Sequence, residues 1–465
     1  MMRQSLTRST RRQVVIAWRR LVFAAGVLTV ASCSRATATS VSLTATDAAP
    51  LHDAVKQVND VIVYDILSPP QASRVYAYAS IAAYEVLRHA DSSYRSLAGQ
   101  VNGLTPLPPR PAGAELSLSL AGVHAYMTVG RALTFSQARM DTLRLAMDLR
   151  FRRDLPADTY ERSIAYGDTV AKHILAWAGR DGFKQRTGLA KYSVLRDAPG
   201  RWIPTPPAYM DAVEPNWGTL RPFTMDTSNQ FRPEPPLPFD TSRTSEFWQQ
   251  MEEVHRVGTT LTTEQRAIAA FWDCNPFVMH VQGHTMFATK KMSPGGHWMG
   301  IARMASHKAN ADIVRASEAY ARTSIALADA FLSVWAEKYR SNVIRPETMI
   351  NQYLDESWQP LLQTPPFPEY TSGHSGISTA AAVVLTQLFG NDFPFADSTE
   401  VEYGLPVRSY TSFEAAANEA AISRLYGGIH YRRAVEQGQI QGRKVGELVL
   451  RKVTTRATPV LASAP

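Results

Sequence analysis

Cysteine is nearly absent from this chain of 465 residues, which contains only Cys33 and Cys274. Two cysteines allow at most one disulfide, and so low a count excludes a cysteine-based zinc site. Stability must therefore come from burial of an apolar core, which the roughly 430 residues after Cys33 are long enough to supply. The content of 45% hydrophobic and 19% charged residues is typical of a globular protein.

Long apolar runs and a basic surface are also missing from the body of the chain. After residue 32, no uninterrupted apolar stretch reaches the roughly 20 residues of a membrane-spanning helix. The formal net charge is +8, but residues 1–32 hold six arginines and no acid, so the remainder carries +2. A nucleic-acid-binding protein needs a basic face on its folded domain. The sequence therefore predicts neither an integral membrane domain nor a nucleic-acid partner.

The first 32 residues have the order of an export signal. A basic region runs to Arg20, and the short apolar stretch 21–31 that follows is too short to span a bilayer. Small residues directly precede Cys33, as in the lipobox of bacterial lipoproteins. This pattern predicts a signal peptide over 1–32 and a lipid anchor on Cys33. It also predicts an exported, membrane-anchored protein on the periplasmic side or the cell surface. The alternative is an ordinary cleaved signal in which Cys33 is incidental.

Apolar residues recur at three- and four-residue spacing through most of the remaining chain, which is typical of amphipathic helices. Val55, Val58 and Ile62 show this spacing, and Pro69-Pro70 separates their helix from the next. Strand signals are few, so the predicted fold class is all-α. The predicted helices lie within 51–66, 75–87, 114–151 (with a break at 134–137), 157–178, 310–340, 376–388, 412–424 and 430–453.

The organisation of the chain follows from changes in composition. Residues 33–50 are mostly Ser, Thr and Ala, as expected of a flexible tether. Residues 202–240 are dense in proline and too long for a simple connector, which predicts an ordered connection without regular structure. The prediction is an N-terminal helical half (51–201), this connection (202–240), a C-terminal helical half with the catalytic bundle (241–455) and a tail (456–465).

Three short blocks in the second half carry the chemistry. They are Trp335-x2-Lys338-x6-Arg345-Pro346, then Phe367-x3-Thr371-Ser372-Gly373-His374, then Ser423-Arg424-x5-His430. Lys338, Arg345 and Arg424 together match the oxygens of a tetrahedral oxyanion, because arginine can bind such oxygens through paired donors. Each block alone is commonplace, but a chance match of all three in this order is improbable, on the order of 10⁻⁴ to 10⁻⁵.

The second and third blocks add an anion-binding backbone and two histidines. Ser372-Gly373-His374 directly precedes a helical run, so its N–H groups are expected to point at an anion. Of His374 and His430, one can act as acid or base near neutral pH, and the other as nucleophile or metal ligand. The sequence therefore predicts an oxyanion site with acid–base chemistry.

This signature resembles that of the vanadium haloperoxidases and the type 2 phosphatidic acid phosphatases, which form one superfamily. The segments FWDCNPF (271–277) and SPGGHWMGIA (293–302) are also similar to bacterial haloperoxidases. The resemblance implies two packed helical bundles holding one vanadate per chain. It implies oxidation of halide by hydrogen peroxide to hypohalous acid at a His-ligated vanadate. The substrates implied are therefore small molecules, and the identity of any organic acceptor is left open.

The resemblance also assigns roles residue by residue. It implies that His430 is the metal ligand and that His374 is the acid–base group acting on peroxide. Lys338 is expected both to bind vanadate and to polarise the peroxide. Trp335 and Phe367 occupy positions where chloroperoxidase-like members carry the aromatic wall of the halide site. The vanadate-binding residues implied are Lys338, Arg345, Ser372, Gly373 and Arg424.

Two positions depart from the family pattern. The family has a proline directly before Ser-Gly-His, and this chain has Thr371 there. The family often has an acid four residues after the ligating histidine, and this chain has Ala434 there. That acid normally orients the imidazole, a role worth about 10–100-fold in metal affinity or activity. The sequence leaves three alternatives, which are replacement by Glu436, replacement by a residue elsewhere such as Asp273, or a less basic histidine.

Two other functions remain open at this point. An acid phosphatase of the same superfamily would use His430 as the nucleophile and His374 as the acid for the leaving group. A non-catalytic oxyanion-binding lipoprotein is the third reading, although binding alone does not need the acid–base histidine. The aromatic pair Trp335 and Phe367 favours the peroxidase.

Overall fold

The computed structural model describes residues 46–113, 115–195 and 197–456, all within one compact unit. The predicted signal peptide, Cys33, most of the tether and the tail beyond residue 456 lie outside the described residues. The α-helices are α1 (Ala49–Tyr64), α2 (Pro69–Leu87), α3 (Leu118–Leu133), α4 (Gln137–Asp154), α5 (Ala157–Ala178), α6 (Glu246–Thr259), α7 (Thr263–Phe271), α8 (Pro294–Lys308), α9 (Ile313–Ser341), α10 (Pro346–Tyr353), α11 (Gly373–Phe389), α12 (Phe413–Tyr426) and α13 (Arg432–Lys452).

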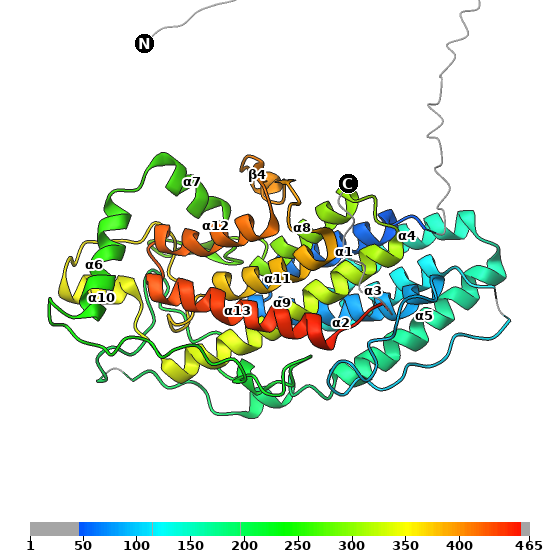
Figure 1. Cartoon of the computed structure of the whole chain (residues 1–465), viewed down its shortest axis with the longest axis horizontal. Helices are drawn as coiled ribbons and strands as arrows, with labels where there is room; N and C mark the ends of the chain where they lie inside the picture. Colours follow the sequence, from blue (N-terminus) through cyan, green and yellow to red (C-terminus); the bar gives the residue numbers. More distant parts are fainter. Residues whose placement is uncertain (1–45, 114, 196, 457–465) are drawn as a thin grey trace, which may run out of the picture. The chain divides into compact units, whose positions relative to one another are not determined.

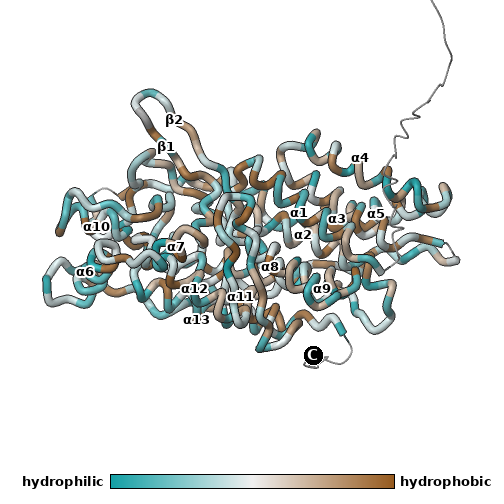
Figure 2. The backbone as a smooth tube through the Cα atoms, turned by 90° about the horizontal axis from the view of Figure 1, so that it is seen from above, coloured by the Kyte–Doolittle hydropathy of each residue, from teal (hydrophilic) through white to brown (hydrophobic). Residues whose placement is uncertain are grey.

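The all-α class predicted from the sequence is confirmed, since the described strands are few and short. They form two separate antiparallel pairs. The pair β1–β2 projects from the helical body as a hairpin, as Figure 2 shows. Among the described residues, no helix combines the length and apolarity needed to cross a bilayer. The strands are β1 (Val278–Gln282), β2 (Thr285–Thr289), β3 (Phe395–Asp397) and β4 (Arg408–Tyr410).

Proline and small polar residues determine where the N-terminal helices begin and end. Pro69 and Pro70 occupy the first turn of α2, where a missing N–H costs nothing, and the Ser68 side chain caps the turn by accepting from Gln71 N. The predicted break at 134–137 appears as the three residues between α3 and α4. Within this part of the chain, α2 packs against α3, and α3 packs against α5 (Figure 1).

The long helix α9 contacts helices from both the N-terminal and the C-terminal part of the chain. It packs against α2 and α8 as well as α11 and α13. Its 29 residues correspond to a length of about 44 Å. From Ile313 to Lys338 nearly every side chain is buried, which is the pattern of a helix surrounded by protein on all sides. Lys338 is therefore carried into the interior by the C-terminal end of α9.

The proline-rich segment 202–240 is fastened onto α9 by buried polar contacts. Asp329 accepts hydrogen bonds from Phe223 N and Thr224 N, both at 2.7 Å. The Val213 carbonyl accepts from Trp335 Nε1 at 3.2 Å. The segment holds one short 3₁₀ turn, η3 (Trp217–Thr219), and its backbone lies close to the C-terminal part of α9.

Close packing of α11 on α13 depends on glycine. A Cβ on Gly442 would lie 2.0 Å from the carbonyl oxygen of Gly376 on α11. A Cβ on Gly438 would lie 2.8 Å from the carbonyl oxygen of Ser372, which is the residue that caps α11. These two glycines allow the helix backbones to approach and hold the start of α11 in place.

We expect Gly442→Ala to destabilise the protein by about 3 kcal/mol, because a new methyl group would collide with backbone rather than with a movable side chain. Urea unfolding followed by circular dichroism measures the change. The control is Gly188→Ala, where a Cβ meets nothing within 4 Å. Equal stability of the two variants would contradict the packing argument.

Candidate active site

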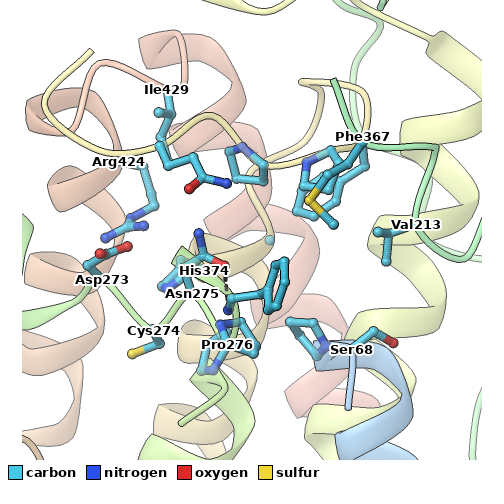
Figure 3. A pocket seen from close by; sticks show the side chains of 18 of the residues that line it. Ser68, Val213, Asp273, Cys274, Asn275, Pro276, Phe367, His374, Arg424 and Ile429 are labelled. Atoms are coloured by element: carbon cyan, nitrogen blue, oxygen red, sulfur yellow. Dashed lines mark hydrogen bonds between the residues drawn. The ribbon is translucent and has the colours of Figure 1, made fainter. Parts of the chain in front are cut away.

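A cavity of about 280 Å³ lies beside the start of α11. Gly373 and His374 contribute to its wall, as do Arg424 near the end of α12 and His430 before α13. Residues 273–277, which follow α7, and Ser68 at the start of α2 complete part of it. Figure 3 shows Arg424 and His374 on one side of the cavity and Phe367 and Val213 on the other.

Three almost fully buried cations gather at this cavity. Arg424 on α12 lines it. Lys338 near the end of α9 and Arg345 just before α10 lie against the ring of Phe367, which also lines it. Lys338 Nζ donates to the carbonyl oxygens of Pro368 and Glu369, at 3.0 and 2.9 Å. Arg345, 0% exposed at the start of α10, has Nη1 2.8 Å from the Ile429 carbonyl and 3.3 Å from His430 Nε2. Neutral carbonyls therefore orient these donors without cancelling their charge.

Arg424 is held by a different set of partners. Its Nη2 donates to the Trp272 carbonyl at 2.6 Å, and its Nε donates to Ser423 Oγ at 3.0 Å. The preceding Ser423 belongs to the third sequence block, so its hydroxyl serves to orient the neighbouring arginine. The guanidinium lines the cavity with these two contacts fixed.

Burial disfavours the charged forms of these three side chains when no anion is present. The pKa of Lys338 is lowered well below its usual value, first by burial and then by the charge of Arg345. Burial also lowers the pKa of Arg345 to about 10 and that of Arg424. A buried cation is stabilised by an adjacent anion, so an anion in the cavity would reverse these shifts.

Unpaired polar atoms mark where such an anion would bind. Arg345 Nη2 and His374 Nε2 are both buried and have no hydrogen-bond partner among the described residues. Buried polar atoms without partners are rare in proteins and indicate a missing ligand or water. The cationic donors and the vacant hydrogen bonds together define a site that fits an oxyanion.

The start of α11 supplies further donors. Ser372 is the N-cap residue, and its side chain accepts from Ser375 N at 3.3 Å and from Ser375 Oγ at 2.8 Å. Gly373 begins the helix and lines the cavity, as the sequence predicted for an anion-binding N-terminus. A lack of acidic residues in the first turn leaves its positive dipole end uncompensated.

The acid that orients His430 is Glu369. His430 Nδ1 lies 2.7 Å from Glu369 Oε1, which also accepts from Tyr431 N at 3.0 Å. The replacement is therefore a residue elsewhere in the chain, and it is neither Glu436 nor Asp273. A side chain 61 residues earlier reaches the imidazole because the loop before α11 folds against the residues before α13. Ala434 is fully buried, and its carbonyl accepts from Ser372 N.

This contact determines which ring nitrogen of His430 faces the site. With Nδ1 donating to the carboxylate, Nε2 keeps its lone pair and points toward Arg345. Burial and then the charge of Arg345 hold the pKa of His430 well below its usual value, which favours the neutral ring. Burial raises the pKa of Glu369 to about 7. A neutral imidazole with its lone pair on Nε2 is the form that can ligate a metal.

His374 is positioned as a separate group. The Trp272 backbone hydrogen-bonds its ring, and Nε2 remains unpaired. Burial and then the charge of Arg424 lower its pKa well below the usual value. The ring lines the cavity, so its free nitrogen can exchange a proton with a molecule bound there.

The two predicted aromatics form one wall of the cavity. The rings of Trp335 and Phe367 have their centroids 4.9 Å apart, and both line the cavity. The cationic ends of Lys338 and Arg345 lie 5.1 and 5.0 Å from the Phe367 centroid. The aromatic wall and the cation cluster are thus adjacent.

Sequence reasoning missed several groups that shape the site. Glu369 stands inside the second block, five residues before His374, but an acid there has no spacing signal that ties it to His430. Trp272 and Val213 act through backbone carbonyls, for which side-chain identity carries no signal. Only the FWDCNPF segment, noted for its similarity to haloperoxidases, pointed to this part of the wall.

Comparisons with known proteins agree with this arrangement. Residues 351–458 match the model of the second helical-bundle domain of vanadium chloroperoxidase. The first bacterial vanadium-dependent iodoperoxidase has a crystal structure similar to this chain, with 47% identity and a TM-score of 0.85. The match covers 90% of this chain and 99% of that one. The chain belongs to the vanadium haloperoxidase superfamily.

More distant structures share the fold. A bacterial vanadium-dependent chloroperoxidase in its holo form matches with 17% identity and a TM-score of 0.64, over 83% of this chain and 93% of that one. Its apo form gives 17% and 0.62, over 82% and 93%. A sequence search of curated proteins finds no match.

We expect Glu369→Gln to weaken orthovanadate binding about 10–100-fold, because an amide is a weaker acceptor for the His430 Nδ1 proton. Equilibrium dialysis with vanadium analysis measures the affinity. The matched control is Glu436→Gln, an exposed position on α13 that should bind vanadate as the unmodified protein does. If Glu436→Gln weakened vanadate binding and Glu369→Gln did not, Glu436 would be the acid that orients His430.

Proposed function

We propose that this protein is a vanadate-dependent haloperoxidase that uses hydrogen peroxide to oxidise iodide. The observation that carries the proposal is the buried cation cluster, with unpaired atoms at Arg345 Nη2 and His374 Nε2, next to His430, whose Nε2 keeps its lone pair. The 47% identity to a vanadium-dependent iodoperoxidase over 90% of the chain supports it.

The residues present fit a bound vanadate. His430 would ligate it through Nε2, while Lys338, Arg345 and Arg424 would neutralise its oxygens and Ser372 and Gly373 would add donors from the start of α11. When bound, vanadate supplies Lewis-acid activation of hydrogen peroxide without changing its own oxidation state. The preorganised cations stabilise negative charge at no cost in reorganisation during turnover.

His374 and Lys338 would act on the substrates. The unpaired Nε2 of His374 can accept a proton from hydrogen peroxide and return it to the departing water. Lys338 has two carbonyl partners, which leaves its third N–H free to polarise a bound oxygen. Both groups are held by backbone carbonyls, so their positions are set before substrate binds.

The choice of iodide rests on the relative, and the apolar wall of the cavity, which chloroperoxidase-like members share, accommodates this halide. Trp335, Phe367, Phe331 and Val213 give this side an apolar surface. Iodide is more weakly hydrated and more polarisable than bromide or chloride, so its transfer out of water costs the least free energy. Chloride would need stronger compensation for its desolvation.

The first experiment strips the purified protein with chelator and reloads it with orthovanadate. We expect vanadate-dependent iodination of a phenolic dye with peroxide, and a smaller rate with bromide. Cleavage of p-nitrophenyl phosphate is assayed in parallel. Phosphatase turnover that vanadate merely inhibits would assign the protein to the acid phosphatases, with His430 as nucleophile.

We expect His374→Ala to lower turnover about 10²–10⁴-fold while vanadate affinity changes little, since the histidine moves a proton rather than holding the cofactor. Steady-state halide oxidation and vanadate titration of the same preparation separate the two quantities. The comparison variant is His430→Ala, which should lose vanadate and activity together. Loss of vanadate in His374→Ala would make that histidine a binding group.

We further propose that the protein is exported and anchored to a membrane by a lipid on Cys33. The basic and apolar segments of residues 1–32 and the small residues before Cys33 support this. Incorporation of labelled fatty acid into the protein, abolished by Cys33→Ala, is the expected result. Equal labelling of that variant would contradict the anchor.

A further inference from the structure

A second cluster of ligating side chains lies outside the oxyanion site. Cys274 follows α7, His297 lies in the first turn of α8, and Glu400 precedes the 3₁₀ turn η4 (Val401–Tyr403). All three are buried, with exposed fractions of 1%, 0% and 0%. Their ligating atoms, Sγ, Nδ1 and a carboxylate oxygen, all lie within 4.8 Å of one another.

Two of the three separations between these atoms match those of ligands around one zinc ion, and the third is about 0.3 Å longer. His297 Nδ1 lies 3.3 Å from Cys274 Sγ and 3.3 Å from Glu400 Oε1, and Sγ and Oε1 are 3.9 Å apart. A charge-assisted hydrogen bond between nitrogen and oxygen is shorter, about 2.7–2.9 Å. Zinc bonds of about 2.3 Å to sulfur and 2.0–2.1 Å to nitrogen and oxygen place tetrahedral ligand atoms roughly 3.3–3.6 Å apart.

The surroundings of His297 resemble those of a metal ligand. Its other ring nitrogen, Nε2, lies 2.7 Å from Asp397 Oδ2 and 2.8 Å from Thr399 Oγ1. A carboxylate on the far nitrogen fixes the ring and directs the opposite nitrogen to a metal in many zinc sites. The geometry therefore presents Nδ1 to Cys274 and Glu400.

An unpaired buried atom in the same cluster points to a missing ligand. Glu400 Oε2 has no hydrogen-bond partner among the described residues, although the side chain is fully buried. An isolated buried carboxylate oxygen is costly unless a cation or a donor compensates it. A metal ion between Oε1, Sγ and Nδ1 would compensate this carboxylate.

We propose that Cys274, His297 and Glu400 bind one divalent transition-metal ion, with Zn²⁺ the best fit. Thiolate and imidazole select zinc over magnesium or calcium, which prefer oxygen ligands. The thiol proton leaves to solvent as the metal binds. The low cysteine count excludes only sites that need several cysteines, because a mixed site needs one.

The position of the cluster indicates a structural role for the ion. The Trp272 ring stacks on His297, with centroids 4.4 Å apart and an interplanar angle of 15°. The carbonyl of the same tryptophan accepts from Arg424, and Cys274 lines the reaction cavity. An ion here would brace the wall that carries these contacts, while leaving the oxyanion site to its own ligands.

The test uses the full-length protein with Cys33→Ser, so that Cys274 is the only thiol. After dialysis against metal-free buffer, it is titrated with Zn²⁺ and, separately, with Co²⁺. We expect about one equivalent of metal to bind, with three protein ligands and water in the fourth position. We also expect a thiolate-to-cobalt charge-transfer band in the near ultraviolet, and protection of Cys274 from a thiol reagent by Zn²⁺.

Variants identify the ligands. Cys274→Ser should lose the cobalt band, and Glu400→Gln should bind metal at least about 100-fold more weakly. Asp397→Asn should keep the band and weaken binding about 10–100-fold, as expected for a residue that only orients the imidazole. The control is Glu402→Gln, an exposed acid two residues after Glu400 that should leave binding unchanged.

The proposal is overturned if neither metal binds more tightly to the parent protein than to Glu400→Gln, or if Zn²⁺ does not protect Cys274. If Cys274→Ser fails to fold, zinc-dependent thermal stabilisation of the parent, absent in Glu400→Gln, gives the same decision. Vanadate affinity is measured on the same samples. A failed zinc titration with intact vanadate binding leaves the proposed function untouched.

Discussion

Positive charge buried in a helical interior is the constraint on which this structure depends. Lys338 and Arg424 lie on two different helices and Arg345 precedes a third, and all three are oriented mainly by neutral carbonyl groups. Carbonyls fix the direction of a donor but leave its charge available, unlike a carboxylate partner. The folding free energy of the rest of the protein offsets the desolvation of these cations. The cavity is therefore arranged for an oxyanion before any ligand binds.

The remaining architecture serves to hold these groups in register. The helix α9 brings Lys338 and Trp335 inward, and the proline-rich segment is fastened to its C-terminal part through Asp329 and the Val213 carbonyl. Gly442 lets α13 approach α11 closely enough to keep the capped helix start beside His430. The Trp272 carbonyl connects Arg424 to the second, sulfur-containing cluster, so both clusters contribute to one wall of the cavity.

Much of the site was predictable because its residues fall in three short blocks. Within a block, backbone geometry ties neighbouring residues to one helix end, so spacing alone indicates shared chemistry, as for Ser372 and Gly373. Glu369 was missed for the opposite reason. Its partnership with His430 spans 61 residues and depends on how a loop folds, which no local pattern encodes. The pairing of Cys274 with His297 and Glu400 has the same character.

The sequence by itself determined the all-α class, the separation of two helices at Pro69-Pro70, the break after α3 and the identity of the cationic and histidine groups. These features follow from periodicity, capping and the chemistry of single residues, all of which act over a few positions. Only the tertiary structure decided which acid orients His430, which carbonyls hold the cations, and which side chains surround His297. Those choices depend on distances between segments far apart in the chain, and such distances arise only from packing.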